Sequence, residues 1–292
     1  MSRSRVFVEV DVFGAGPYLG NPLAVVIDGE GLSDAEMQRF ARWTNLSETT
    51  FLLPPAHPSA DYSLRIFTTE TELPFAGHPT LGSCRAWLEH HPEAAGRERF
   101  VQHCAAGLIH LRRYGADLAF LAPPLLRSGP VEEPTLMSFA AQLGVGREEI
   151  VDAGWVDNGP GWAAVLLADA ASVLRLRPAG IEAPIGAVGP YPDGGEAAFE
   201  VRAFLPAKGG VAEDPVTGSL NAALAQWLLS SGRASAPYVA SQGTALGRAG
   251  RVHLSLETDP HGADSEGGEA TGDAEVWVGG SATICVRGVA DL

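Results

Sequence analysis

The chain has 292 residues, 46% of them hydrophobic and 19% charged, which is a globular composition with room for two domains. Its net charge of −15 at pH 7 argues against nucleic acid as a partner, because the phosphate backbone would repel it. No apolar run approaches the roughly 20 residues that cross a bilayer, and no signal-peptide core follows the N-terminus. We therefore expect a cytoplasmic protein without membrane contacts.

The cysteines and histidines predict neither disulfides nor a metal site. Cys84, Cys104 and Cys285 form no C-x-x-C pair and are too scattered for a disulfide framework. The histidines lack zinc-ligand spacing, and adjacent His90 and His91 would point about 100° apart on a helix. No flavin or nicotinamide motif occurs, so the sequence predicts no cofactor.

The first part of the chain alternates strand-like and helical segments. A capping box, Ser33-Asp-Ala-Glu36, predicts a short helix that reaches about Trp43. Pro79 favours the start of a second helix that reaches about His90. Runs rich in β-formers predict strands at residues 6–12, 23–27, 48–53, 62–67, 107–113 and 118–121.

The same alternation returns after Pro123-Pro124. Helices are predicted over residues 134–143, with Gly144 as the C-cap, and over residues 215–230. Strands are predicted at residues 150–156, 162–167, 198–204, 239–243 and 252–256. Many strands, few helices and no βαβ rhythm predict the α+β class.

Two similar halves follow from this alternation. We expect them to cover residues 1–124 and 125–282, with a last strand near 283–292 that can return to the first half. The stretch 257–275 holds seven acidic residues and no Lys or Arg, so it predicts a solvated acidic loop in the second half.

One pattern occurs twice and predicts the place of a site. Residues 78–83 read HPTLGS and residues 214–219 read DPVTGS, and each precedes an apolar helical segment with a tryptophan. Helices that start at Pro79 and Pro215 would leave backbone N–H groups free for a ligand. Two such ends, related by an approximate twofold, predict a cleft with two poles for anions. Taken singly, each motif favours an ordinary helix start capped by His78 or Asp214, and it is the pairing that favours a site.

A set of motifs resembles the phenazine-biosynthesis isomerases, the PhzF-like family. In chain order these motifs are Asp11-Val-Phe13, Gly20-Asn-Pro-Leu-Ala-Val-Val26, Asn45-Leu-Ser-Glu-Thr49, Gly77-His-Pro-Thr80, Glu213-Asp-Pro-Val-Thr-Gly-Ser219, Gln242-Gly243, Gly247-Arg248 and Val278-Gly-Gly-Ser-Ala282. The resemblance spans nearly the whole chain. It implies a diaminopimelate-epimerase-like fold, in which two halves of similar topology each wrap a sheet around a central helix. It also implies a site between the halves and a homodimer.

The resemblance further implies roles for single residues. In the characterised branch, a glutamate of the Asn-Leu-Ser-Glu-Thr motif shuttles a proton and isomerises trans-2,3-dihydro-3-hydroxyanthranilate without a cofactor. Here that glutamate is Glu48, and a partly desolvated glutamate would be both a better base and a returnable acid. His78 and Asp214 would hold polar groups of the substrate or relay protons. The candidate substrate-binding residues are Gly77, Gly218, Ser219, Asn21, Gln242 and Gly243.

Three alternatives stay open. His78, Asp214 and Ser219 together could form a serine hydrolase, although Ser219 lies outside any Gly-x-Ser-x-Gly turn. An isomerase or epimerase of a different small cyclic or amino-acid-like carboxylate fits as well as phenazine chemistry does. A non-catalytic, small-molecule-binding member of the fold is the third. Racemisation by two thiols is disfavoured, because no cysteine falls in the Gly77 or Gly218 motifs.

Overall fold

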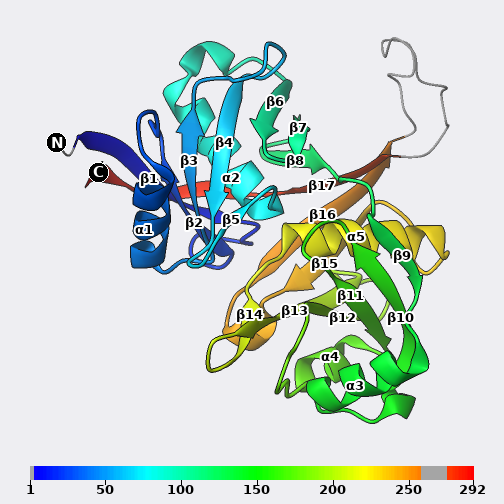
Figure 1. Ribbon diagram of the computed structural model, residues 1–292. Coiled ribbons are helices and arrows are strands. Elements are labelled where there is room, and N and C mark those ends of the chain that lie inside the picture. The colour runs from blue at the N-terminus through cyan, green and yellow to red at the C-terminus, as the bar shows by residue number, and fades with distance from the viewer. Residues whose placement is uncertain (1–2, 258–274) are drawn as a thin grey trace.

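Figure 1 shows the computed structural model, which describes residues 3–257 and 275–292. The predicted α+β class is confirmed, because strands dominate and two buried helices, α2 (Gly77–His90) and α5 (Gly218–Ser230), each pack against a separate group of strands. Among the described residues, no helix is long and apolar enough to cross a membrane. The predicted acidic loop 257–275 falls almost entirely outside the described part of the chain.

The N-terminal half contains α2 and the last strand of the chain. Its other helix is α1 (Asp34–Thr44). Its strands are β1 (Ser4–Val12), β2 (Asn21–Val26), β3 (Glu48–Leu53), β4 (Tyr62–Phe67), β5 (Glu72–Leu73), β6 (Arg99–Cys104), β7 (Gly107–Tyr114), β8 (Asp117–Leu121) and β18 (Ala282–Asp291).

The C-terminal half contains α5 and two shorter helices, α3 (Glu133–Leu143) and α4 (Ala170–Arg175). Its strands are β9 (Arg127–Pro130), β10 (Ile150–Asp157), β11 (Ala163–Leu167), β12 (Ile185–Pro190), β13 (Phe199–Ala207), β14 (Gly210–Asp214), β15 (Tyr238–Gln242), β16 (Gly250–Glu257) and β17 (Glu275–Gly280).

Strand pairing shows that the second half repeats the first. In the first half the neighbours run β18-β1-β2-β3-β4-β6-β7-β8, and in the second they run β9-β10-β11-β12-β13-β15-β16-β17. The two parallel pairs of the first half, β2–β3 and β4–β6, reappear as β11–β12 and β13–β15. Antiparallel β8 and β17 join the halves at the centre.

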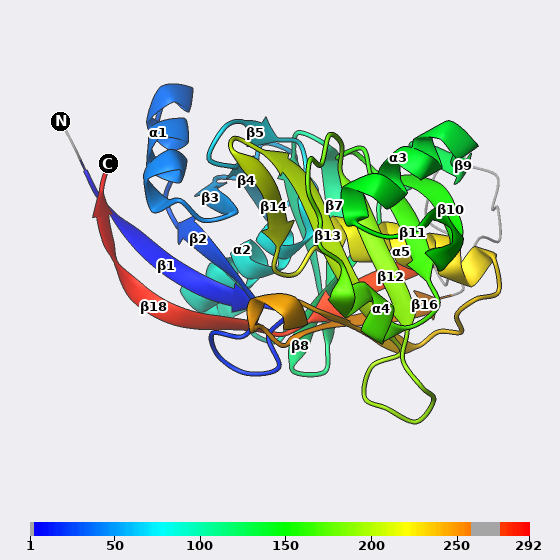
Figure 2. The ribbon, with the colours of Figure 1, turned by 90° about the horizontal axis from the view of Figure 1, so that it is seen from below.

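The last strand lies against the first. β18 pairs with β1 from Ser4–Asp291 to Val12–Ala282, and Figure 2 shows the two strands side by side as they leave the molecule. We propose a boundary between the halves near residue 124, with β18 as part of the N-terminal half. This pairing supports that division.

Local signals set two of the helix ends as predicted. Ser33 and Glu36 form the reciprocal capping box at the start of α1, and left-handed Asn45 ends that helix. Gly144, with φ 74°, ends α3 and its N–H returns to Ala140 and Ala141. The helix bounds therefore agree with the sequence where cap chemistry is local.

The predicted starts of the two central helices were wrong. α2 begins at Gly77 rather than Pro79, and α5 begins at Gly218 rather than Pro215. Pro215 comes directly after β14, whose Asp214 still pairs with Ala203, so the chain stays extended there before it turns. Proline suits such an extended link, because its fixed φ also occurs in strand-edge and turn conformations.

The register of the repeat was wrong as well. Phe67 pairs with Glu72 in the first half, and Phe204 pairs with Glu213 in the second. Counting on from these pairs aligns residues 72–77, ELPFAG, with residues 213–218, EDPVTG. The true repeat is therefore Glu-x-Pro-x-x-Gly, five residues out of step with the alignment suggested by the sequence.

Two Arg–Glu ion pairs repeat with the same geometry. Arg65 forms two hydrogen bonds to Glu72, of 2.7 and 2.6 Å, and Arg202 forms two to Glu213, of 2.8 and 2.7 Å. The second pair is more buried, with side chains 6% and 12% exposed against 25% and 36%. The duplication therefore extends from the strands to individual side chains.

The two central helices meet end to end. A Cβ atom built on Gly77 would lie 2.8 Å from the Gly218 Cα, and one built on Gly218 would lie 2.8 Å from the Gly77 Cα. Only glycine allows this approach. The helix starts therefore touch on the pseudo-twofold axis, rather than facing each other across an open cleft.

Candidate active site

Residues from both halves meet beside the start of α2. Asn21 is the first residue of β2, Glu48 the first of β3 and His78 the second of α2, while Asp214 is the last of β14. The first three belong to the N-terminal half and Asp214 to the other. The structure thus brings together the three predicted catalytic residues and Asn21 where the halves join.

Glu48 and His78 face each other in a closed setting. The Glu48 Oε2 atom lies 3.4 Å from the His78 Nε2 atom, and the side chains are 15% and 4% exposed. Neither atom has a hydrogen-bond partner among the described residues. Such unpaired buried polar atoms are costly, and they are typical of a site that a substrate completes.

Asn21 links the two halves of the site. Its side-chain N–H₂ group donates to Asp214 Oδ1 and to the Val216 carbonyl, both at 2.9 Å, and lies 3.3 Å from His78 Nδ1. Because this group can only donate, the neutral His78 ring carries its proton on Nε2, toward Glu48. Asn21 therefore orients the His78 ring as well as the Asp214 carboxylate.

Asp214 is held from several sides. The Thr217 hydroxyl donates to its Oδ2 atom at 2.5 Å, and the Ser47 hydroxyl lies 3.5 Å from its Oδ1 atom. Neither Thr217 nor Ser47 was predicted as a site residue. Each stands in a motif quoted for the resemblance, next to Gly218 and Glu48 respectively, so those motifs were the available signal.

Gln242 is 1% exposed and fixes the segment that carries Asp214. Its Nε2 atom donates to the Asp214 carbonyl and the Thr217 hydroxyl, at 3.0 and 2.9 Å. Its Oε1 atom accepts from the Thr217 N–H and from Asn221, at 3.0 and 2.8 Å. Both ends of the amide are thus occupied within the protein. A substrate contact by Gln242 or by neighbouring Gly243, with φ 90°, stays a prediction.

Ser219 makes its side-chain and carbonyl hydrogen bonds to residues outside this cluster. Its hydroxyl accepts from Trp162 Nε1 at 3.1 Å, and its carbonyl accepts from Asn158 Nδ2 at 2.9 Å. In the structural register Ser219 is the counterpart of His78, on the other side of the Gly77–Gly218 contact. The hydroxyl bond to Trp162 disfavours the serine hydrolase alternative. The predicted substrate contact of Ser219 is untested.

Burial shifts the pKa values of the three catalytic candidates, upward for the two carboxyl groups and downward for His78. Loss of water raises the pKa of Glu48 well above its usual range, and the charge of Asp214 raises it further. Burial also raises the pKa of Asp214 to about 6, against hydrogen bonds from Thr217, Asn21 and Ser47 that lower it. Burial lowers the pKa of His78 to about 3. At neutral pH the site thus holds a neutral His78 and a largely ionised Asp214, beside a Glu48 carboxyl that keeps its proton more readily than one in water.

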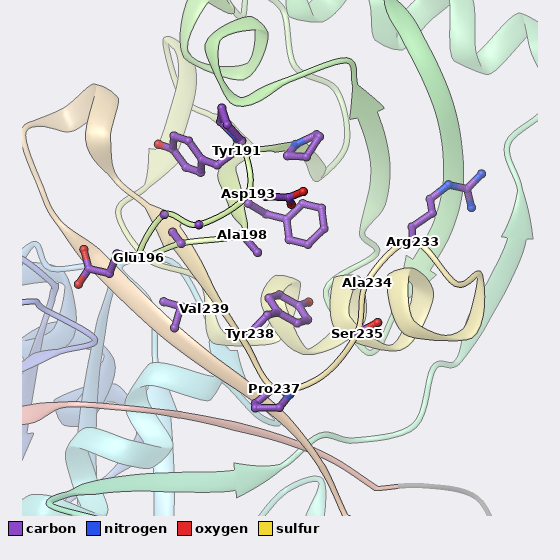
Figure 3. Close-up of a pocket in the computed structure, with 16 residues that line it drawn as sticks. Tyr191, Asp193, Glu196, Ala198, Arg233, Ala234, Ser235, Pro237, Tyr238 and Val239 are labelled. Atoms are coloured by element: carbon purple, nitrogen blue, oxygen red, sulfur yellow. The ribbon is translucent and has the colours of Figure 1, made fainter.

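The rest of the described chain offers little competing chemistry. No group of three or more His, Cys, Asp or Glu side chains in residues 3–257 and 275–292 is placed to hold a metal ion. Cys84 and Cys104 are buried, and Cys285 lies in β18. A cavity of about 470 Å³ between residues 190–199 and 233–239 contains none of the predicted site residues (Figure 3).

Comparisons with known proteins agree with this geometry. The family described as "Phenazine biosynthesis-like protein" matches residues 10–288. Antisense-enhancing sequence 1 of Schizosaccharomyces pombe is 34% identical over 97% of both chains. A trans-2,3-dihydro-3-hydroxyanthranilate isomerase of Pseudomonas aeruginosa is 33% identical over 86% of this chain and 90% of its own length. The crystal structure of a PhzF-family phenazine biosynthesis protein of Bacillus anthracis covers 99% of this chain and 100% of that one, with a TM-score of 0.80 and 19% identity.

Proposed function

Since this chain belongs to the phenazine biosynthesis-like protein family and is an isomerase, we propose that it moves a proton on a small cyclic or amino-acid-like carboxylate without a cofactor. Glu48 carries the proton, and His78 and Asp214 complete the catalytic group. The observation that supports this most strongly is the buried Glu48 carboxyl, 3.4 Å from His78 and without a hydrogen-bond partner among the described residues.

In the proposed reaction Glu48 takes a proton from one carbon and returns it to another on the same face of the substrate. A carboxyl pKa raised toward neutrality suits this, since both its base and its acid forms are populated. Ionised Asp214 helps to keep that pKa high. The Nε2–H of neutral His78 can then donate to a substrate oxygen or to Glu48 itself.

The start of α2 supplies a place for the substrate's negative charge. Its N-cap residue, Ala76, has no side-chain acceptor, so no capping hydrogen bond reaches the N–H groups at the start of the helix, such as those of Gly77 and His78. A helix N-terminus with free N–H groups favours a carboxylate or a developing oxyanion. We assign this part of substrate binding to Gly77, with Asn21 and Gly218 holding the surrounding backbone.

Trans-2,3-dihydro-3-hydroxyanthranilate, the substrate named for the Pseudomonas relative, is the first compound to test. Proton transfer in D₂O should place deuterium on a substrate carbon, and Glu48→Gln should stop this incorporation. Glu30→Gln, at an exposed glutamate outside the site, is the matched control and should exchange normally. Full incorporation by Glu48→Gln would remove Glu48 from its role.

The same assay separates the alternatives. An isomerase of a different acid would incorporate deuterium with another cyclic or amino-acid-like carboxylate, and an epimerase would invert the labelled carbon. A non-catalytic binding protein would bind such acids without exchange. We also propose a cytoplasmic homodimer, and light scattering after gel filtration should give twice the mass of 30.5 kDa.

A further inference from the structure

The pseudo-twofold axis gives the molecule a second junction between its halves. The first junction carries the candidate active site, beside the start of α2. The second lies beside the start of α5, where the β10–β11 loop meets the β5–α2 link. The two junctions use equivalent backbone segments, so residue pairs between them can be compared directly.

The second junction lacks the polar residues of the first. Because Ile66 pairs with Leu73 as Ala203 pairs with Asp214, Leu73 stands where the other junction has Asp214. The strand pairs Ala24–Thr49 and Ala163–Ile185 are likewise equivalent. Ala24 is thus equivalent to Ala163, and Thr49 to Ile185. Three residues before the first pair, Pro160 takes the position of Asn21; one residue before the second pair, Pro184 takes the position of Glu48. The second junction therefore cannot perform the same acid–base chemistry.

A cavity of about 490 Å³ occupies this second junction. Its size falls within the roughly 300–1,000 Å³ of small-molecule sites. Apolar side chains supply most of its wall, among them Leu73, Phe75, Ile109, Leu121 and Pro160, and none of its lining residues is Lys, Arg, Asp or Glu. Apart from His110 at the exposed rim, the wall has no side chain that can carry a positive charge, so a neutral, apolar ligand matches it better than a carboxylate does.

One polar side chain in the wall has an unused acceptor. Asn158 is 7% exposed and lines the cavity. Its Nδ2 atom donates to the Ser219 carbonyl, but its Oδ1 atom has no hydrogen-bond partner among the described residues. A buried acceptor without a partner is destabilising, so a donor supplied by a ligand would be favourable.

We propose that this cavity binds a small, uncharged ring compound with one N–H or O–H group, which donates to Asn158. The ligand class differs from the carboxylate proposed for the Glu48 site, and the inference does not depend on that function. The cavity is thus a second binding site, built on the same repeated backbone as the first.

Indole and benzothiophene, used on the full chain, test the proposal. They have nearly the same size and apolar surface, but only indole has an N–H donor. Equilibrium dialysis should show saturable binding of one indole, with benzothiophene about fivefold weaker, since one hydrogen bond changes affinity by about 2- to 12-fold. Equal affinities would overturn the role of Asn158, and no saturation by indole would overturn the site.

A pair of rim variants locates the binding. Ala105 and Ala106 are adjacent exposed residues in the β6–β7 turn, and only Ala106 lines the cavity. Ala106→Trp should fill part of the cavity and weaken indole at least about tenfold, whereas Ala105→Trp should stay within about twofold of the parent. Glu48→Gln should bind indole as the parent does. Unchanged affinity in Ala106→Trp, or lost affinity in Glu48→Gln, would place indole elsewhere and refute the proposal.

Discussion

The two junctions between the halves share a backbone and differ in chemistry. Beside α2, a chain of polar contacts of 2.9, 3.3 and 3.4 Å runs from Asp214 through Asn21 and His78 to Glu48. Beside α5, the counterpart of Asp214 is Leu73, and the wall is mostly apolar. Duplication therefore fixes where sites can form, and a handful of side chains decides what each can do.

The largest expected effect is on catalytic rate, and it comes from replacing each of two equivalent residues at the helix starts by alanine. His78→Ala should lower the rate of deuterium incorporation about 10³-fold, because it removes the ring that faces Glu48. Ser219→Ala should change the rate less than about threefold, since its hydroxyl is bound by Trp162. Initial rates in D₂O measure both. A Ser219→Ala loss as large as that of His78→Ala would mean that both junctions serve the reaction.

The paired Arg–Glu bonds give the next effect, on stability. Arg202→Met should lower the free energy of unfolding by about 3 kcal/mol, because it leaves Glu213 buried without its partner. It also frees the Val173 and Leu176 carbonyls that Arg202 binds. The equivalent Arg65→Met should cost less than about 1 kcal/mol, since that pair is more exposed. Urea titration compares them, and equal losses would contradict the difference in burial.

The Gly77–Gly218 contact predicts a smaller loss in the free energy of unfolding than the loss expected for Arg202→Met. Gly218→Ala would put a methyl group 2.8 Å from the Gly77 Cα, and should cost about 2 kcal/mol because backbone must move. Gly96→Ala is a suitable control, since nothing lies within 4 Å of its added Cβ atom. The urea midpoint should fall for the first variant alone. An unchanged midpoint for Gly218→Ala would show that the helix starts are not in contact.

The smallest effect concerns pH. Because the pKa of Asp214 is raised from 3.8 to about 6, its contribution to stability is fully present below about pH 4 and is lost as pH rises through 6. Asp214→Asn should remove part of that decline and make the protein about 1–2 kcal/mol more stable at pH 8, while lowering activity. Unfolding free energies at pH 4 and 8 measure this. A variant less stable than the parent at pH 8 would show that the charged form is favoured.

Sequence patterns predicted those parts of the fold that depend on neighbouring residues. The caps Ser33 and Gly144 act within one turn of their helices, so they could be recognised directly. The starts of α2 and α5 could not, because long-range pairing sets them. Asp214 pairs with Ala203 across a hairpin, and this keeps the chain extended through Pro215. The same pairing fixed the true register of the repeat.

The site was predictable in part. The motif around Glu48 and those around His78 and Asp214 named residues that the fold brings together. The support around Asp214 depends on contacts between distant segments, such as Asn21 to the Val216 carbonyl and Gln242 to Thr217. No spacing along the chain shows which amide meets which carbonyl. The apolar junction likewise became visible only once the pseudo-twofold was known.

The position of β18 has a consequence for the order of folding during synthesis. The second half, from β9 to β17, is one continuous stretch of chain, so its strands can assemble as they leave the ribosome. The first half cannot be completed until residues 282–291 have been made, because they form β18, which pairs with β1 along its whole length. Until translation reaches them, β1 has an open edge that other chains could pair with. The half that is made first is therefore finished last.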